Sequence, residues 1–179
     1  MLFRSPAQLS FSSSGIGSGT HFAGELFKLA AGINVVHVPY RGTPEAINDV
    51  ISGRIPYMTA PVLPAMTLVK SGRLSPLAVT TRERIKLLPE LPTIAEAALP
   101  GFEYDGWYGI FAPAKTPRAI IDKISREVGR ILHMADIDEK IAATGAIAKA
   151  STPAEFDKLV RDEIVMRGKV FKAAGAKAE

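Results

Sequence analysis

Short apolar runs bounded by Gly, Ser or Pro recur in the first half of the chain and predict β-strands. They lie at residues 8–14, 33–40, 54–60 and 74–81. The run at 33–40, INVVHVPY, is apolar and β-branched, which favours a buried strand. Residues 102–113 predict a longer extended segment around Trp107, the only tryptophan.

Between these runs, apolar residues recur three or four positions apart, which predicts amphipathic helices. The predicted helices cover residues 19–32, 42–53, 61–72, 115–135, 136–145 and 151–175, with a short helix beginning after Thr93. Helix signals mark several ends: Gly32 as a C-cap, Thr43 as an N-cap before Pro44, and a capping box from Thr93 to Glu96. Alternating strands and helices indicate an α/β fold with a mainly parallel sheet.

Composition limits the class of protein. The chain has 179 residues, 47% hydrophobic and 22% charged, which suits one domain or one domain with part of a second. The net charge of +4 comes from scattered Lys and Arg, so a nucleic-acid surface is not favoured. The absence of Cys excludes disulfides and thiol catalysis. No apolar run approaches the ~20 residues of a membrane-spanning helix, and MLFRSPAQLSF lacks the pattern of a signal peptide.

A Gly/Ser-rich loop before a helix is the strongest candidate site. The stretch SSSGIGSGTHFAGELF, residues 12–27, supplies hydroxyls and free backbone N–H groups that suit an anion such as a carboxylate. It departs from the dinucleotide fingerprint because Thr20 stands where Gly or Ala is needed, and it lacks the lysine of a P-loop. A nucleotide-dependent enzyme using this loop stays as an alternative, and so does a simple flexible turn.

A second candidate site is VPYRGTPEA, residues 38–46, where Tyr40 and Arg41 follow a strand end. His21, His37 and His133 show no metal-binding spacing, so no metal site is expected. No G-x-S-x-G elbow or Ser/His/Asp set is present, so nucleophilic catalysis is not supported and no cofactor is expected.

Taken together, the segments at 12–27, 36–55, 71–117 and 151–156 resemble the Bug-type substrate-binding proteins of tripartite tricarboxylate transporters, from about Leu9 to about Gly175. The resemblance implies a type II periplasmic-binding-protein fold, a Venus flytrap, that closes over a small carboxylate. It implies a non-catalytic receptor in the periplasm, which hands a di- or tricarboxylate or an acidic amino acid to membrane transporter subunits.

The same resemblance implies a set of ligand-binding residues in three loops. These are Ser13, Ser14, Gly17, Ser18, Thr20 and His21, then Tyr40, Arg41 and Gly42, then Thr59 and Ala60. Many relatives carry Asp or Asn near the third loop, where this chain reads MTAPVLPA.

The resemblance also implies an N-terminally truncated chain with one nearly complete lobe. Residues 1–103 would form most of the ligand-binding second lobe, and residues 104–179 would return into the first lobe, crossing on a strand around Trp107. Helices of an incomplete lobe would lack a sheet to cover, so either self-association or an irregular packing of the C-terminal helices is expected. An interaction protein that has lost ligand binding is a further alternative.

Overall fold

The computed structural model describes residues 9–175, and every structural statement below refers to this part of the chain. The expectation about a signal peptide concerns the N-terminal residues and lies largely outside it. The described residues form two compact units. One contains the chain up to Asp105 together with the residues from Arg167 onward, and the other contains Gly106–Met166. The assignment of 1–103 and 104–179 to two lobes stays a prediction.

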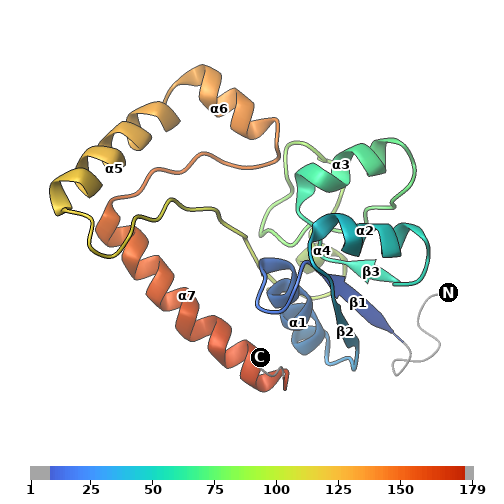
Figure 1. Ribbon diagram of the computed structural model, residues 1–179. Helices are drawn as coiled ribbons and strands as arrows, with labels where there is room; N and C mark the ends of the chain where they lie inside the picture. Colours follow the sequence, from blue (N-terminus) through green and yellow to red (C-terminus); the bar gives the residue numbers. More distant parts are fainter. Residues whose placement is uncertain (1–8, 176–179) are drawn as a thin grey trace. The chain divides into compact units, whose positions relative to one another are not determined.

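A small parallel sheet organises the first unit. Its strands are β1 (Ser10–Ser13), β2 (Val36–Pro39) and β3 (Tyr57–Met58), in the order β2-β1-β3 (Figure 1). Phe11 pairs with His37 on one side and with Tyr57 on the other, and both pairings are parallel. The predicted α/β fold with a parallel sheet is confirmed.

Helices lie on both faces of this sheet. Adjacent residues of β1 point to opposite faces, so each face contacts a different helix. The ring of Phe11, fully buried, lies against Gly24 of α1 (Gly19–Ala31). The next residue, Ser12, donates from Oγ to the Ala46 carbonyl of α2 (Thr43–Ile51), at 3.2 Å. β1 is therefore the central strand of an α/β/α arrangement.

The helix ends follow local sequence signals in most places. Gly32 caps α1 in the left-handed conformation, with φ of 62°, as predicted. α3 spans Val62–Lys70, and α4 spans Ile94–Ala97. The capping box of Thr93 and Glu96 is present at the start of α4, as predicted. At α2, however, the N-cap is Gly42, and Thr43 is already helical, so the predicted Thr43 cap is wrong.

Two strand predictions are also wrong. β2 is an edge strand rather than a buried one, because it pairs only with β1, and Val36 is 58% exposed. Residues 74–81 form no strand of the sheet; Val79 makes a single parallel bridge to Thr93. Pro76, which has no N–H, removes a donor from any ladder there. Val79 is nevertheless buried in the core of the first unit.

The second unit is helical and has no buried residue among 106–166. It contains α5 (Arg118–Leu132), α6 (Ala135–Ala142) and the first part of α7 (Pro153–Ala173), which continues into the first unit. The predicted apolar face of α5 exists but stays exposed, since Ile120 is 48% and Ile124 is 42% accessible.

The segment around Trp107 joins no ladder among the described residues, so the strand expected there is not formed. Instead its aromatic residues pack on α7: the Trp107 and Phe111 rings lie 5.3 and 5.2 Å from the Phe156 ring. A strand needs a neighbour to accept its hydrogen bonds, and none of the described strands lies in this unit. No described helix is long and apolar enough to cross a membrane.

We predict that Gly24→Ala destabilises the first unit by ~1–3 kcal/mol, because the added methyl would overlap the Phe11 ring. Gly168→Ala is the matched control: this glycine lies within α7 with open space around its Cβ position, so alanine should stabilise by ~0.5–1 kcal/mol. Urea unfolding followed by circular dichroism measures both. Equal effects of the two substitutions would contradict the close α1–β1 packing.

Candidate functional site

All three predicted loops lie at the same edge of the sheet. Because the strands are parallel, their carboxyl ends at Ser13, Pro39 and Met58 point the same way. The loop after β1 lies next to the loop after β2, since the Tyr40 N–H donates to the Ser13 carbonyl at 3.0 Å. This edge is where ligands bind in open α/β sheets.

The hydroxyls of the first loop bind one another. The Thr20 Oγ1 lies 3.0 Å from the Ser14 Oγ and 3.0 Å from the Ser18 Oγ. The Ser14 N–H also donates to Thr20 Oγ1, and the His21 N–H donates to Ser18 Oγ, which caps α1. These side chains therefore hold the loop against the first turn of the helix.

This hydroxyl cluster keeps at least one proton to offer. Each hydroxyl carries one proton and two lone pairs. Three protons are shared over two hydroxyl–hydroxyl contacts, and each contact uses only one. At least one hydroxyl proton can therefore point at an anion.

The backbone N–H groups of the loop are partly used within the loop. The Gly15 N–H donates to Ser13 Oγ at 3.2 Å, and the Gly17 N–H donates to His21 Nδ1 at 3.0 Å. Gly17 has φ of 76°, a conformation that favours glycine. These hydrogen bonds therefore define the shape of the loop.

Two residues of the second loop have different surroundings. The Tyr40 hydroxyl donates to Asp49 Oδ2 of α2 at 2.6 Å, and this hydrogen bond raises the pKa of Tyr40. Arg41 is exposed, and its backbone N–H donates to Glu45 Oε2. Tyr40 thus ties its loop to α2, while the Arg41 guanidinium faces solvent.

The remaining predicted residues lie at the same sheet edge. Gly42 caps α2, and Thr59 and Ala60 follow β3 and are half-buried. Their ligand-binding role stays a prediction.

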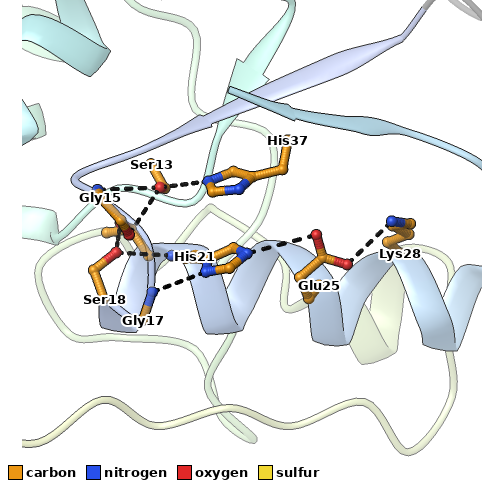
Figure 2. Close-up of polar contacts among 9 residues, drawn as sticks. Ser13, Gly15, Gly17, Ser18, His21, Glu25, Lys28 and His37 are labelled. Carbon is orange, nitrogen blue, oxygen red and sulfur yellow. Dashed lines mark hydrogen bonds and ion pairs between the residues drawn. The ribbon is translucent and has the colours of Figure 1, made fainter. Parts of the chain in front are cut away.

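A cluster beneath the loop was missed by the sequence analysis. His21, predicted as a ligand contact, is 3% exposed, and its ring stacks on His37 with centroids 3.8 Å apart (Figure 2). Its Nε2 lies 3.7 Å from Glu25 Oε1, and Lys28 Nζ lies 3.2 Å from Glu25 Oε2. His37 Nε2 lies 2.6 Å from Ser13 Oγ. The i,i+4 spacing of His21 and Glu25 was the available signal.

This cluster is not arranged as a metal site. The candidate ligand atoms of His21, Glu25 and His37 lie within 4.8 Å of one another. The two imidazole planes are only 10° from parallel and are stacked, so their in-plane lone pairs do not converge. A metal ion needs nitrogen ligands at ~2.0–2.1 Å along those lone pairs. The Gly17 N–H already occupies Nδ1 of His21.

Burial keeps both imidazoles neutral. Burial, with a smaller contribution from the nearby His21, lowers the pKa of His37 to about 4. Burial also lowers the pKa of His21, although Glu25 opposes this effect. Neutral imidazoles can accept hydrogen bonds, and this is the role the contacts require of His21.

The end of α7 packs against this cluster. The Phe171 ring lies 4.8 Å from His21 and 5.7 Å from Phe22, and the Arg167 guanidinium lies 4.8 Å above the Phe22 ring. The first turn of α1 is thus covered by the C-terminal helix of the described chain.

A cavity of about 300 Å³ lies between α2 and α3. It is lined by Pro44, Ile47, Asn48, Pro64, Thr67 and Leu68 of α2 and α3. None of these is a predicted site residue.

Comparisons with known proteins identify the sequence class. A family described as the tripartite tricarboxylate transporter family receptor matches residues 2–176. A UPF0065 protein from Pseudomonas sp. strain P51 is 36% identical over 159 residues, which are 88% of this chain and 47% of that protein. Another UPF0065 protein, from Pseudomonas knackmussii, is 32% identical over 158 residues, which are 88% of this chain and 94% of that protein.

Solved structures show the same fold. The chain is 33% identical to Rpa4515 of R. palustris, solved with adipate, with a TM-score of 0.85 over 95% of this chain and 57% of that one. MatC of Rhodopseudomonas palustris, solved with bound malate, is 28% identical, with a TM-score of 0.81 over 92% of this chain and 57% of that one. The periplasmic binding protein BugD is 28% identical, with a TM-score of 0.80 over 97% and 59%.

These matches confirm the expected periplasmic-binding-protein fold. The chain spans about half the length of several of its curated relatives and somewhat more than half of these solved structures.

We predict that the unfolding midpoint falls as the pH drops from 7 to 5. The unfolded His37 titrates near 6.5, whereas burial lowers its folded pKa to about 4. Between these values the unfolded state binds more protons, so acid favours unfolding; above 6.5 both states are neutral and this dependence vanishes. Glu96 and Glu155, whose pKa values are lowered by hydrogen bonds, add their dependence below 4.5.

Thermal melts at pH 7, 6 and 5 measure this slope. His37→Asn should flatten it, and the control substitution of the exposed His133 by Asn should not. A midpoint constant between pH 7 and 5 in the unmodified chain would refute the buried neutral pair.

Proposed function

We propose that this chain, which belongs to the tripartite tricarboxylate transporter receptor family, binds a small carboxylate at the loop before α1. The observation that carries this proposal is the position of the α1 N-terminus at the carboxyl edge of the sheet. The first helical N–H groups, at Gly19 and Thr20, have no acceptor within the helix. The first turn contains no acidic residue, so the positive end of the helix dipole is not neutralised locally.

The surrounding polar groups suit the same ligand. The hydroxyl cluster of Ser14, Ser18 and Thr20 offers at least one further donor to a carboxylate oxygen. The exposed Arg41 follows the neighbouring strand and adds positive charge at this edge. The donors are mostly neutral, so we expect the affinity to depend only moderately on salt.

The chemistry of the relatives supports a dicarboxylate. Rpa4515 was solved with adipate and MatC with bound malate, and both compounds carry two carboxylates on a short chain. We therefore place short dicarboxylates first, ahead of tricarboxylates and acidic amino acids.

We further propose that the chain acts in the periplasm as a non-catalytic receptor. BugD is a periplasmic binding protein, and the family is that of a transporter receptor. The residues described here would supply one side of the site, and closure of a two-lobed receptor would deliver the ligand to membrane subunits. A nucleotide-dependent enzyme is not favoured, because the loop lacks the lysine of a P-loop.

We predict that Ser18→Gly combined with Thr20→Val weakens malate or adipate binding at least tenfold, ~1.4 kcal/mol. Glycine is chosen because it caps helices almost as well as serine, and valine because it keeps the shape of threonine. Isothermal titration at pH 7.5 measures the affinity, with Ser71→Ala at the end of α3 as a control expected to bind normally.

Three other ligands complete this test: citrate, aspartate and a nucleotide with Mg²⁺. Tighter binding of the nucleotide than of any carboxylate would overturn the proposal in favour of the enzyme. If the folded chain binds none of these ligands, the interaction protein without a ligand is favoured instead.

A further inference from the structure

We propose that His21 is a positioning residue rather than a ligand contact: its unprotonated Nδ1 fixes the loop at residues 14–18, which makes anion binding by that loop sensitive to acid. The part of this inference that concerns binding rests on the proposed function. The part that concerns the loop rests on the contacts of His21 alone.

His21 holds the loop by two hydrogen bonds on adjacent residues. Its backbone N–H donates to the Ser18 Oγ at 3.1 Å, and its Nδ1 accepts from the Gly17 N–H at 3.0 Å. His21 thus holds both the N-cap residue of α1, Ser18, and the backbone N–H of Gly17. Gly17 has φ of 76°, so its peptide has few steric constraints of its own and needs such an anchor.

The bond from Gly17 defines the tautomer of His21. A backbone N–H can only donate, so Nδ1 must present its lone pair. In the neutral ring the proton is therefore on Nε2, which faces Glu25 Oε1 at 3.7 Å. Figure 2 shows this line of contacts from Gly17 through His21 and Glu25 to Lys28.

Packing keeps the ring in this orientation. The His21 ring is stacked on His37 at 3.8 Å, and Phe171 lies 4.8 Å away. His37 acts on the start of the same loop, because its Nε2 lies 2.6 Å from the Ser13 Oγ, which accepts from the Gly15 N–H. The two stacked imidazoles thus support the two ends of the loop.

Protonation of His21 would break this arrangement. A charged imidazole carries protons on both nitrogens, so Nδ1 would face the Gly17 N–H with a second donor. The charged groups around the ring have opposite effects on the pKa of His21. On α1, Glu25 favours the charged form and Lys28 opposes it, and His37 from β2 stacks on the ring.

Two other elements pack around the cluster. β3 contributes Tyr57, whose pKa is raised to about 12 by burial and by Glu25, so it stays neutral. α7 contributes the cation of Arg167, which lies over the adjacent Phe22. Burial is the largest influence on the pKa of His21 and lowers it. The loop therefore keeps its bond to Nδ1 at neutral pH and loses it on acidification.

Two substitutions separate the effect of the hydrogen-bond acceptor of His21 from the effect of its ring packing. His21→Asn removes the ring but keeps an acceptor oxygen at the δ position, and it does not titrate. His21→Phe keeps a ring between His37 and Phe171 but has no acceptor. The first readout is hydrogen exchange at the Gly17 amide of the ligand-free 179-residue chain by ¹⁵N NMR, expressed as a protection factor. The second is malate and adipate affinity at pH 7.5 and 5.5.

We expect His21→Asn to protect Gly17 at both pH values, and His21→Phe to lower the protection factor at least tenfold. The unmodified chain should lose protection progressively as the pH is lowered, whereas His21→Asn should not. Affinity should follow the same order, and comparison at equal pH removes the titration of the ligand itself.

The opposite order, with Gly17 protected in His21→Phe and exposed in His21→Asn, would overturn the proposal, since ring packing would then position the loop. Protection of Gly17 that is equal in all three chains would overturn it too. If the unmodified chain binds neither dicarboxylate while protection follows the expected order, the proposed function fails and the positioning role of His21 stands.

Discussion

The pairing of β1 on both of its sides is the constraint on which the first unit depends. Four residues, Ser10–Ser13, hold β2 and β3 in register, and neither neighbour pairs with the other. Alternation along β1 sends Phe11 to α1 and Ser12 to α2, so one short strand also anchors both helical layers. The strand ends at Ser13, and the candidate site begins at that residue.

A chain of contacts connects this strand to the candidate loop. β1 brings Ser13 to the His37 ring, and the parallel register places His37 over His21. His21 in turn contacts Gly17 and Ser18, and Ser18 caps the helix whose N-terminus faces the sheet edge. The shape of the proposed anion-binding loop thus depends on groups that would not need to touch an anion.

Most signals within one segment were predictable from the sequence, the N-cap of α2 being an exception. The parallel α/β class was predictable too, but the strand order and the contacts between segments were not. The C-cap at Gly32 and the box of Thr93 with Glu96 depend on neighbours within a few residues, and both were predicted correctly. The edge position of β2 depends on strand order, which the apolar pattern of INVVHVPY does not encode. The stacking of His21 on His37 depends on the register of β1 with β2 and on the position of α1 against the sheet. The sequence predicted the loop hydroxyls as hydrogen-bond donors, but it did not show that they bind one another in the folded loop.

Different forces stabilise each of the two units, taken separately. Within residues 9–175, every buried hydrophobic residue belongs to the first unit, and residues 106–166 contain no buried residue. The helices of that segment instead carry exposed ion pairs one turn apart: Arg118–Asp122, Glu127–Arg130, Asp136–Lys140, Asp157–Arg161 and Lys158–Asp162. Such pairs contribute ~0.2–0.5 kcal/mol each and are screened by salt. Because salt screens these pairs and no residue of 106–166 is buried, we expect local order in this segment to be more sensitive to ionic strength than the sheet.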